Sequence, residues 1–237
     1  LMKKSYQLAG YTLHVIPTKK FKNITMSLKL ENKLTRENVT KRSLLAFMLT
    51  GGTQNYPSTQ ALSRHLEDLY GMSFGTNLAT KGIGQVLNIS SVWINEAFLP
   101  YQEDLLKEQI KMFNDVLFNP NVKDGKFDEK TFNIKKKELK ERLIAQNDDK
   151  FMYGIDQLFT NMGEGGFLSI RNNGYIDEID QISNEELYQY LQECIENDSK
   201  HIYVVGDVNE NIVETFKENL QFKTNPAAVY PVTNFKS

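Results

Sequence analysis

One segment constrains the fold of this chain more than any other. Residues 43–49 contain five large apolar side chains in seven positions, and the segment runs into Gly51-Gly52 and then Tyr56-Pro57. An apolar run that ends at glycine is typical of a core helix with a glycine C-terminal cap. We therefore expect a buried helix here, with most of its side chains packed inward.

The rest of the chain contains separate blocks of strand and helix patterns. Apolar residues recur at every second position in 24–30 and 85–94, as in strands with one buried face. Ser183 is followed three residues later by Glu186, which is typical of a capping box. These blocks predict an α+β fold, with a largely antiparallel sheet covered by helices on one side. We expect strands over 11–15, 24–30, 72–80, 85–94 and 200–206, a loop over 31–38, and helices over 39–50, 58–71, 100–117, 128–146, 151–162, 184–195 and 213–220.

Further motifs follow in a fixed order along the chain. The first is Phe127-Asp-Glu-Lys-Thr-Phe132, and Lys137-Glu-Leu-Lys-Glu-Arg-Leu143 and Asp148-Asp149 come after it. The last is Val204-Val-Gly-Asp-Val208, at the end of a predicted strand. Together with the 43–57 segment, this order resembles the insulinase, pitrilysin and mitochondrial-processing-peptidase family. The resemblance extends over nearly the whole chain, to about residue 222.

In that family the helix equivalent to 43–49 carries an inverted zinc motif, H-x-x-E-H. Two histidines four residues apart reach one Zn²⁺, and the glutamate accepts a proton from zinc-bound water. By the resemblance, the histidine positions hold Ser43 and Phe47, and the glutamate position holds Ala46. The third ligand, a glutamate on a later helix, falls on Arg142, although a shift of one residue would place Glu141 there. We therefore expect no catalytic residue, no metal ligand and no zinc cofactor.

The resemblance also implies an organisation. The fold expected is the mitochondrial-processing-peptidase-like metallohydrolase half-unit, with an N-terminal domain over 1–222 and a linker or tail over 223–237 towards a C-terminal half. Within the family, this sequence most resembles the catalytically degenerate proteins of Gram-positive bacteria, which pair with an active homologue. Such a subunit would help to enclose a peptide chamber. In active relatives the strand equivalent to 72–80 lies near the substrate, so Ser73, Phe74, Gly75, Thr76 and Asn77 are candidate peptide-binding residues.

Two other functions remain open from the residues alone. The first is a metal-dependent endopeptidase with ligands from elsewhere, such as His65, Glu67 and Glu141, in which case zinc would be required. The second is a scaffold component that binds no peptide. His14 and His201 have no histidine partner nearby in sequence, so we expect structural roles for them unless the fold brings them together.

Composition limits partners and location. The net charge is −2, and no basic patch is interleaved with aromatic residues, so we expect no nucleic acid partner. No apolar run approaches the ~20 residues of a membrane span, and no apolar segment follows the N-terminal lysines as in a signal peptide. The single cysteine, Cys194, fits a core position and a cytoplasmic protein. The lysine-rich segment 135–142 is either a solvated helix face or the cationic wall of a peptide chamber.

Overall fold

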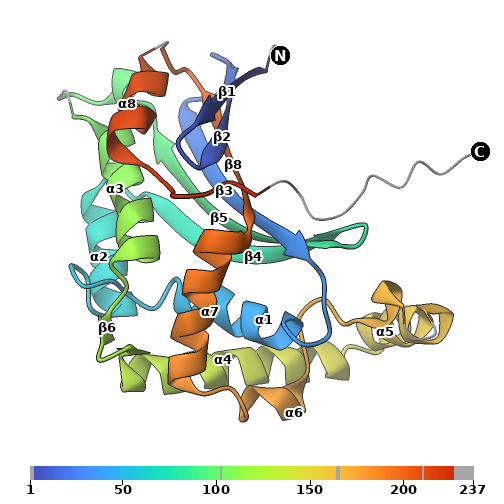
Figure 1. Ribbon diagram of the computed structural model, residues 1–237. Coiled ribbons are helices and arrows are strands. Elements are labelled where there is room, and N and C mark those ends of the chain that lie inside the picture. Colours follow the sequence, from blue (N-terminus) through green and yellow to red (C-terminus); the bar gives the residue numbers. More distant parts are fainter. Residues whose placement is uncertain (1–2, 102, 164–165, 210, 227–237) are drawn as a thin grey trace, which may run out of the picture.

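The computed structural model describes residues 3–101, 103–163, 166–209 and 211–226. Its centre is a six-stranded sheet with the strand order β1-β2-β8-β3-β5-β4 (Figure 1). Neighbouring strands are antiparallel except for β2 and β8, which are parallel. The predicted α+β fold is confirmed, with a mixed rather than purely antiparallel sheet. The strands are β1 (Lys4–Leu8), β2 (Tyr11–Pro17), β3 (Asn23–Lys33), β4 (Ser73–Lys81), β5 (Gly84–Ile94) and β8 (Ser199–Gly206).

One face of the sheet forms the core. Ile24, Met26, Leu28 and Leu30 of β3 are buried and alternate with partly exposed residues, as the period of two predicts. In Figure 1 the helices lie mainly on this side of the sheet, where α1 contacts both α4 and α7. The helices are α1 (Val39–Met48), α2 (Thr59–Asp68), α3 (Leu105–Phe118), α4 (Glu129–Asp148), α5 (Lys150–Gly163), α6 (Ile176–Ile179), α7 (Asn184–Asn197) and α8 (Ile212–Asn219). Short elements η1 (Glu96–Phe98), β6 (Val122–Lys123), β7 (Lys126–Phe127) and η2 (Phe167–Ser169) connect them.

Several boundaries differ from the sequence prediction. The expected loop over 31–38 is wrong at its start, because β3 continues to Lys33, which pairs with Gly84 of β5. The helix expected from residue 100 begins at Leu105, since the Asp104 carboxylate caps it by accepting from the Lys107 amide. The Ser183 cap is confirmed, with the hydroxyl oxygen accepting from the Glu186 amide at 3.1 Å.

The end of the described chain packs against the domain. In the tail expected over 223–237, the Thr224 carbonyl accepts from the Lys200 Nζ at 3.0 Å. The Asn225 side chain accepts from the Lys200 amide at 2.9 Å. The segment expected as a linker or tail therefore begins with residues that contact β8, and residues 227–237 lie outside the described residues.

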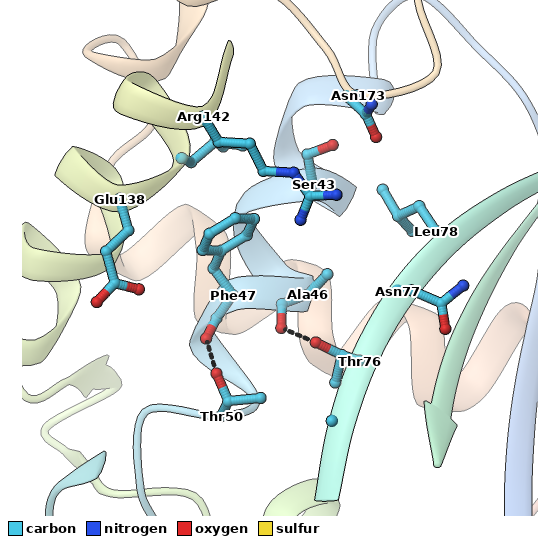
Figure 2. A pocket seen from close by; sticks show the side chains of 12 residues that line it. Ser43, Ala46, Phe47, Thr50, Thr76, Asn77, Leu78, Glu138, Arg142 and Asn173 are labelled. Carbon is cyan, nitrogen blue, oxygen red and sulfur yellow. Dashed lines mark hydrogen bonds between the residues drawn. The ribbon is translucent and has the colours of Figure 1, made fainter. Parts of the chain in front are cut away.

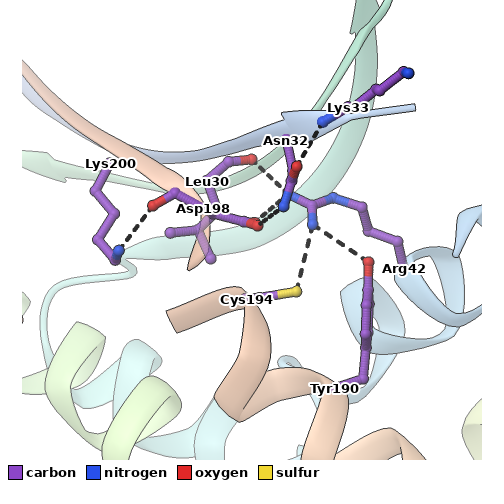
Figure 3. A network of polar contacts seen from close by, with 8 residues as sticks. All are labelled: Leu30, Asn32, Lys33, Arg42, Tyr190, Cys194, Asp198 and Lys200. Carbon is purple, nitrogen blue, oxygen red and sulfur yellow. Dashed lines mark hydrogen bonds and ion pairs between the residues drawn. The ribbon is translucent and has the colours of Figure 1, made fainter. Parts of the chain in front are cut away.

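Helix α1 is held at the centre of the fold by a buried ion pair. The Arg42 Nη2 donates to the Asp198 carboxylate at 2.6 Å and to the Leu30 carbonyl at 2.7 Å (Figure 3). Asn32 donates to the other oxygen of Asp198 at 2.7 Å. The two charged side chains are 2% and 1% exposed. Because Asp198 joins α7 to β8 and Leu30 belongs to β3, one guanidinium fixes α1 against three other elements.

We expect replacement of Asp198 by alanine to lower the free energy of unfolding by about 3–5 kcal/mol, because the Arg42 guanidinium would stay buried without its counter-charge. Urea denaturation followed by circular dichroism measures this change. The matched control is Glu214→Ala in the exposed Lys217–Glu214 pair, which should cost less than about 0.5 kcal/mol. Equal small losses in both variants would show that the buried pair does not hold the fold.

Candidate functional site

A cavity of about 270 Å³ lies between α1, α4 and the edge strand β4. Figure 2 shows the side chains that surround it, with the segment before α6 closing one side. The lining residues are Ser43, Ala46, Phe47 and Thr50 of the α1 segment, 75–78 of β4, Glu138, Leu139 and Arg142 of α4, and Asn173. The four positions that the sequence assigned to a degenerate zinc site therefore share one cavity.

The side chains at these four positions do not have the chemistry of a zinc site. Ser43 offers one neutral hydroxyl, and Ala46 and Phe47 offer no side-chain donor atom. The guanidinium of Arg142 lies 5.7 Å from the centroid of the Phe47 ring and carries a permanent positive charge, which repels a metal cation. The zinc ion that the family resemblance implies does not fit these residues.

Glu141, the alternative position for the third ligand, lies elsewhere. Its carboxylate pairs with Lys137 at 3.7 Å on the exposed side of α4. Arg142 lines the cavity, whereas Glu141 does not. The two residues are neighbours on a helix and point in directions about 100° apart, so only one of them can face α1.

The candidate peptide-binding residues of β4 divide into two groups. Gly75, Thr76 and Asn77 line the cavity, and the Thr76 hydroxyl donates to the Ala46 carbonyl at 2.6 Å. Ser73 and Phe74 do not line it, and the Phe74 ring packs edge-on against Phe113 with centroids 5.9 Å apart. Since β4 is the last strand of the sheet, no described strand pairs with its outer edge.

The alternative metal ligands do not come together. His65 stacks on Tyr56 with ring centroids 4.1 Å apart, and Glu141 is paired with Lys137 on α4. Within the described parts of the chain, no group of three or more His, Cys, Asp or Glu side chains lies close enough to hold a metal ion. The proposed set of His65, Glu67 and Glu141 is therefore wrong.

The lysine-rich segment 135–142 forms neither a wholly solvated face nor a cationic wall. Lys135 is buried and pairs with Glu138 at 2.8 Å, and Lys140 pairs with Asp180 at 2.6 Å. The Nζ of Lys136 donates to the Ile182 carbonyl at 3.0 Å. Of the basic side chains in this segment, only Arg142 lines the cavity.

Cys194 is a core residue, as predicted. It is buried beside the Arg42 guanidinium, whose Nη1 lies 3.4 Å from the sulfur (Figure 3). Burial raises the pKa of the thiol to about 12. A thiol with this pKa is almost entirely protonated at neutral pH and is a poor nucleophile.

Asn173 is a cavity residue that the sequence analysis did not identify. It reaches the cavity because Gly174, with φ of +87°, lets its segment approach α1 closely. A Cβ atom at this glycine would lie 2.7 Å from the Cα of Thr40. The Asn-Asn-Gly sequence signals such a turn, but it does not indicate which helix the turn contacts.

Two histidines meet on the sheet face opposite the helices. The His14 Nε2 and the His201 Nδ1 are 3.1 Å apart, so one ring donates to the other. The Ser5 hydroxyl contacts the other nitrogen of His14 at 2.8 Å. Burial, with smaller contributions from Lys3 and His201, lowers the pKa of His14 to about 4. The pair depends on the parallel pairing of β2 with β8, which no local sequence pattern indicates.

Among the helices that the structure describes, none is both long and apolar enough to cross a membrane.

Solved structures define the class of this fold. A conserved protein from Enterococcus faecalis V583 matches with a TM-score of 0.88 and 31% identity, over 98% of this chain and 56% of that one. The "peptidase M16 inactive domain" from Pseudomonas fluorescens matches with a TM-score of 0.75 and 16% identity, over 97% of this chain and 53% of that one. The fold is thus that of an M16 peptidase domain.

The sequence comparison agrees with the fold. The "Probable inactive metalloprotease YmfF" from Bacillus subtilis (strain 168) is 33% identical over 225 residues, which make up 95% of this chain and 53% of that protein. No protein-family model matches the sequence. The chain is a homologue of the M16, or insulinase-type, peptidases with the structure of one half-unit domain, and it spans about half the length of its curated relative.

Replacement of Ser43 by alanine should leave the free energy of unfolding unchanged or raise it by up to about 1 kcal/mol. The Ser43 hydroxyl is buried and has no hydrogen-bond partner in the part of the chain that the structure describes, so its removal relieves a desolvation cost. Thr76→Val is the matched control, because its hydroxyl bonds the Ala46 carbonyl and its loss should cost about 1 kcal/mol. Chemical denaturation measures the free energy of unfolding of both variants. A destabilised Ser43→Ala variant would contradict the conclusion that the Ser43 hydroxyl makes no hydrogen bond.

The histidine pair predicts a pH dependence of stability. Because the pKa of folded His14 lies near 4, below the ordinary value of 6.5, the unfolded chain binds more protons between these values. Stability from this group is therefore complete above about pH 6.5 and is lost as the pH falls towards 4. The free energy of unfolding, measured between about pH 7 and pH 4.5, should fall less steeply in His14→Gln. Identical slopes in both proteins would contradict a neutral, buried His14.

Proposed function

We propose that this protein is a catalytically inactive M16 subunit that holds an extended peptide and acts together with an active homologue of the family. The observation that carries the proposal is the convergence of Ser43, Ala46, Phe47 and Arg142 on one cavity. These are the positions at which the family resemblance places the zinc ligands and the general base. The name of the Bacillus subtilis relative, an inactive metalloprotease, is consistent with this proposal.

The free edge of β4 supports peptide binding. An edge strand presents unpaired backbone amides and carbonyls, to which an extended peptide adds as a further strand. Gly75, Thr76 and Asn77 belong to this strand and also line the cavity. A peptide paired with β4 would pass beside Arg142 and Phe47, where active relatives would hold the scissile bond.

An exposed apolar surface supports a protein partner. Helix α5 contains no buried residue, and it extends away from the body of the domain in Figure 1. Large apolar side chains that are exposed together on one surface of a domain are typical of a protein interface. We propose that an active M16 homologue, or the C-terminal half of the same protein, covers this surface. Its exposed side chains are Phe151, Met152, Tyr153, Leu158, Phe159 and Met162 of α5, with Phe167 and Leu168 of η2.

Zinc content tests the inactive-site proposal. Dialysed against micromolar zinc, the native chain should retain far less than one zinc ion, because three of its four site positions have no ligand atom and the fourth is a hydroxyl. The variant with Ser43→His, Ala46→Glu, Phe47→His and Arg142→Glu should retain close to one. Elemental analysis of the dialysed protein gives both values.

The control restores only Ser43→His and Ala46→Glu, which leaves the site two ligands short. This control should resemble the native chain. One tightly held zinc ion in the native chain, together with hydrolysis of a peptide pool by the purified protein, would refute the proposal. Failure of the four-residue variant to bind zinc would show that these positions are not the family's ligand positions.

A further inference from the structure

The Ser43 hydroxyl and the Arg142 guanidinium both line the cavity and have no acceptor among the described residues. Ser43 is 3% exposed, and its hydroxyl has no hydrogen-bond partner among the described residues. The guanidinium of Arg142 stacks near the Phe47 ring, and no described carboxylate lies within ion-pair distance of it. In Figure 2 the Arg142 side chain extends from α4 across the cavity towards α1, where Ser43 lies. A buried hydroxyl without a hydrogen-bond partner destabilises the folded protein unless a ligand accepts its hydrogen bond.

The other polar side chains around the cavity each make at least one hydrogen bond. The Thr76 hydroxyl donates to the Ala46 carbonyl at 2.6 Å, and the Thr50 hydroxyl donates to the Phe47 carbonyl at 2.9 Å. The one acidic lining residue, Glu138, accepts from the buried Lys135 at 2.8 Å, which neutralises it. The cavity therefore offers a positive charge and a free hydroxyl, without a competing free acid.

Arg142 has no described ion-pair partner, whereas two nearby lysines of the same helix have one. Lys137 pairs with Glu141, and Lys140 pairs with Asp180, both on the exposed side of α4. Lys136 donates to main-chain carbonyl groups. Thus the cation that lines the cavity has no anionic partner among the described residues.

The size and chemistry of the cavity favour a single carboxylate. A volume of about 270 Å³ accommodates a side chain or a peptide end, not a large organic ligand. A guanidinium binds a carboxylate through two parallel N–H···O bonds, and Ser43 can donate a third. A phosphate dianion would be matched by only one positive charge here, so a carboxylate is the better fit.

We propose that this cavity binds a carboxylate of an extended peptide, with Arg142 as the cation and the Ser43 hydroxyl as the second donor. The inference rests on the proposed function, because it places the peptide along β4. The carboxylate is either the C-terminus of the peptide or an acidic side chain. The positively charged guanidinium then occupies the place where active relatives hold a metal cation, and it attracts an anionic group without hydrolysing the peptide.

Three peptide pools test the inference. Each contains acetylated random octapeptides, and the first has a free C-terminal carboxylate but no Asp or Glu. The second is identical except for a C-terminal amide, and the third is amidated with one internal glutamate. Immobilised protein is incubated with each pool, and the retained peptide is quantified by mass spectrometry. We expect the first or third pool to be retained about fivefold more than the second.

The variants decide which residue causes the difference. In Arg142→Gln the excess over the amidated pool should disappear, and in Arg142→Lys it should be reduced, because lysine keeps the charge but loses the planar fork. The matched control is Lys137→Gln, which removes one charge from the exposed side of the same helix and should keep the excess. Thermal unfolding confirms that each variant is folded.

The outcomes separate this inference from the proposed function. Equal retention of all three pools, or an excess that survives in Arg142→Gln, overturns the carboxylate site and leaves peptide binding intact. If no pool is retained, peptide binding fails instead. The Arg142 Nε–H signal in nuclear magnetic resonance spectra, titrated with N-acetylalanine and with its amide, then tests the site alone. A shift with the acid only supports the carboxylate site, and equal or absent shifts refute it.

Discussion

The ion pair between Arg42 and Asp198 is the interaction on which the position of α1 depends. A guanidinium buried in a protein core is tolerated only when its charge is balanced, and here Asp198 supplies the counter-charge while the Leu30 carbonyl accepts a further hydrogen bond. These partners belong to β3 and to the junction of α7 with β8, so the requirement of one side chain fixes three elements. Since Ser43, Ala46 and Phe47 follow Arg42 on α1, the same pair also orients the cavity.

In this cavity the backbone arrangement expected of the family's zinc site is present, but the side chains at the four positions do not suit a zinc ion. Helix α1, its glycine turn and the facing helix α4 bring four positions together, as a metal site in this family would require. The side chains at those positions now combine an apolar ring, a hydroxyl and a guanidinium. Arg142 brings a positive charge to this place, and Ala46 stands where the family resemblance puts the glutamate that accepts a proton from water.

The apolar surface of the domain is unevenly distributed. The inward faces of β3 and β5 carry mainly apolar side chains, whereas α5 leaves several large apolar side chains exposed. The chain spans about half of its curated relative, and the partner that we propose would cover the exposed side chains of α5. Apolar area of this size remains in water at a free-energy cost that burial against a protein would remove.

The sequence by itself determined the elements whose cause is local. The alternation in β3 and β5, the serine cap of α7 and the apolar segment 43–49 each predicted the structure that forms, since periodicity and capping depend on neighbouring residues. The motif order also brought Ser43, Ala46, Phe47 and Arg142 into one hypothesis. Only the tertiary structure decided that Arg142 rather than Glu141 faces α1, that His14 meets His201, and that Asn173 closes the cavity. These contacts join residues far apart in the chain, and their geometry depends on strand register and helix rotation, which local patterns do not specify.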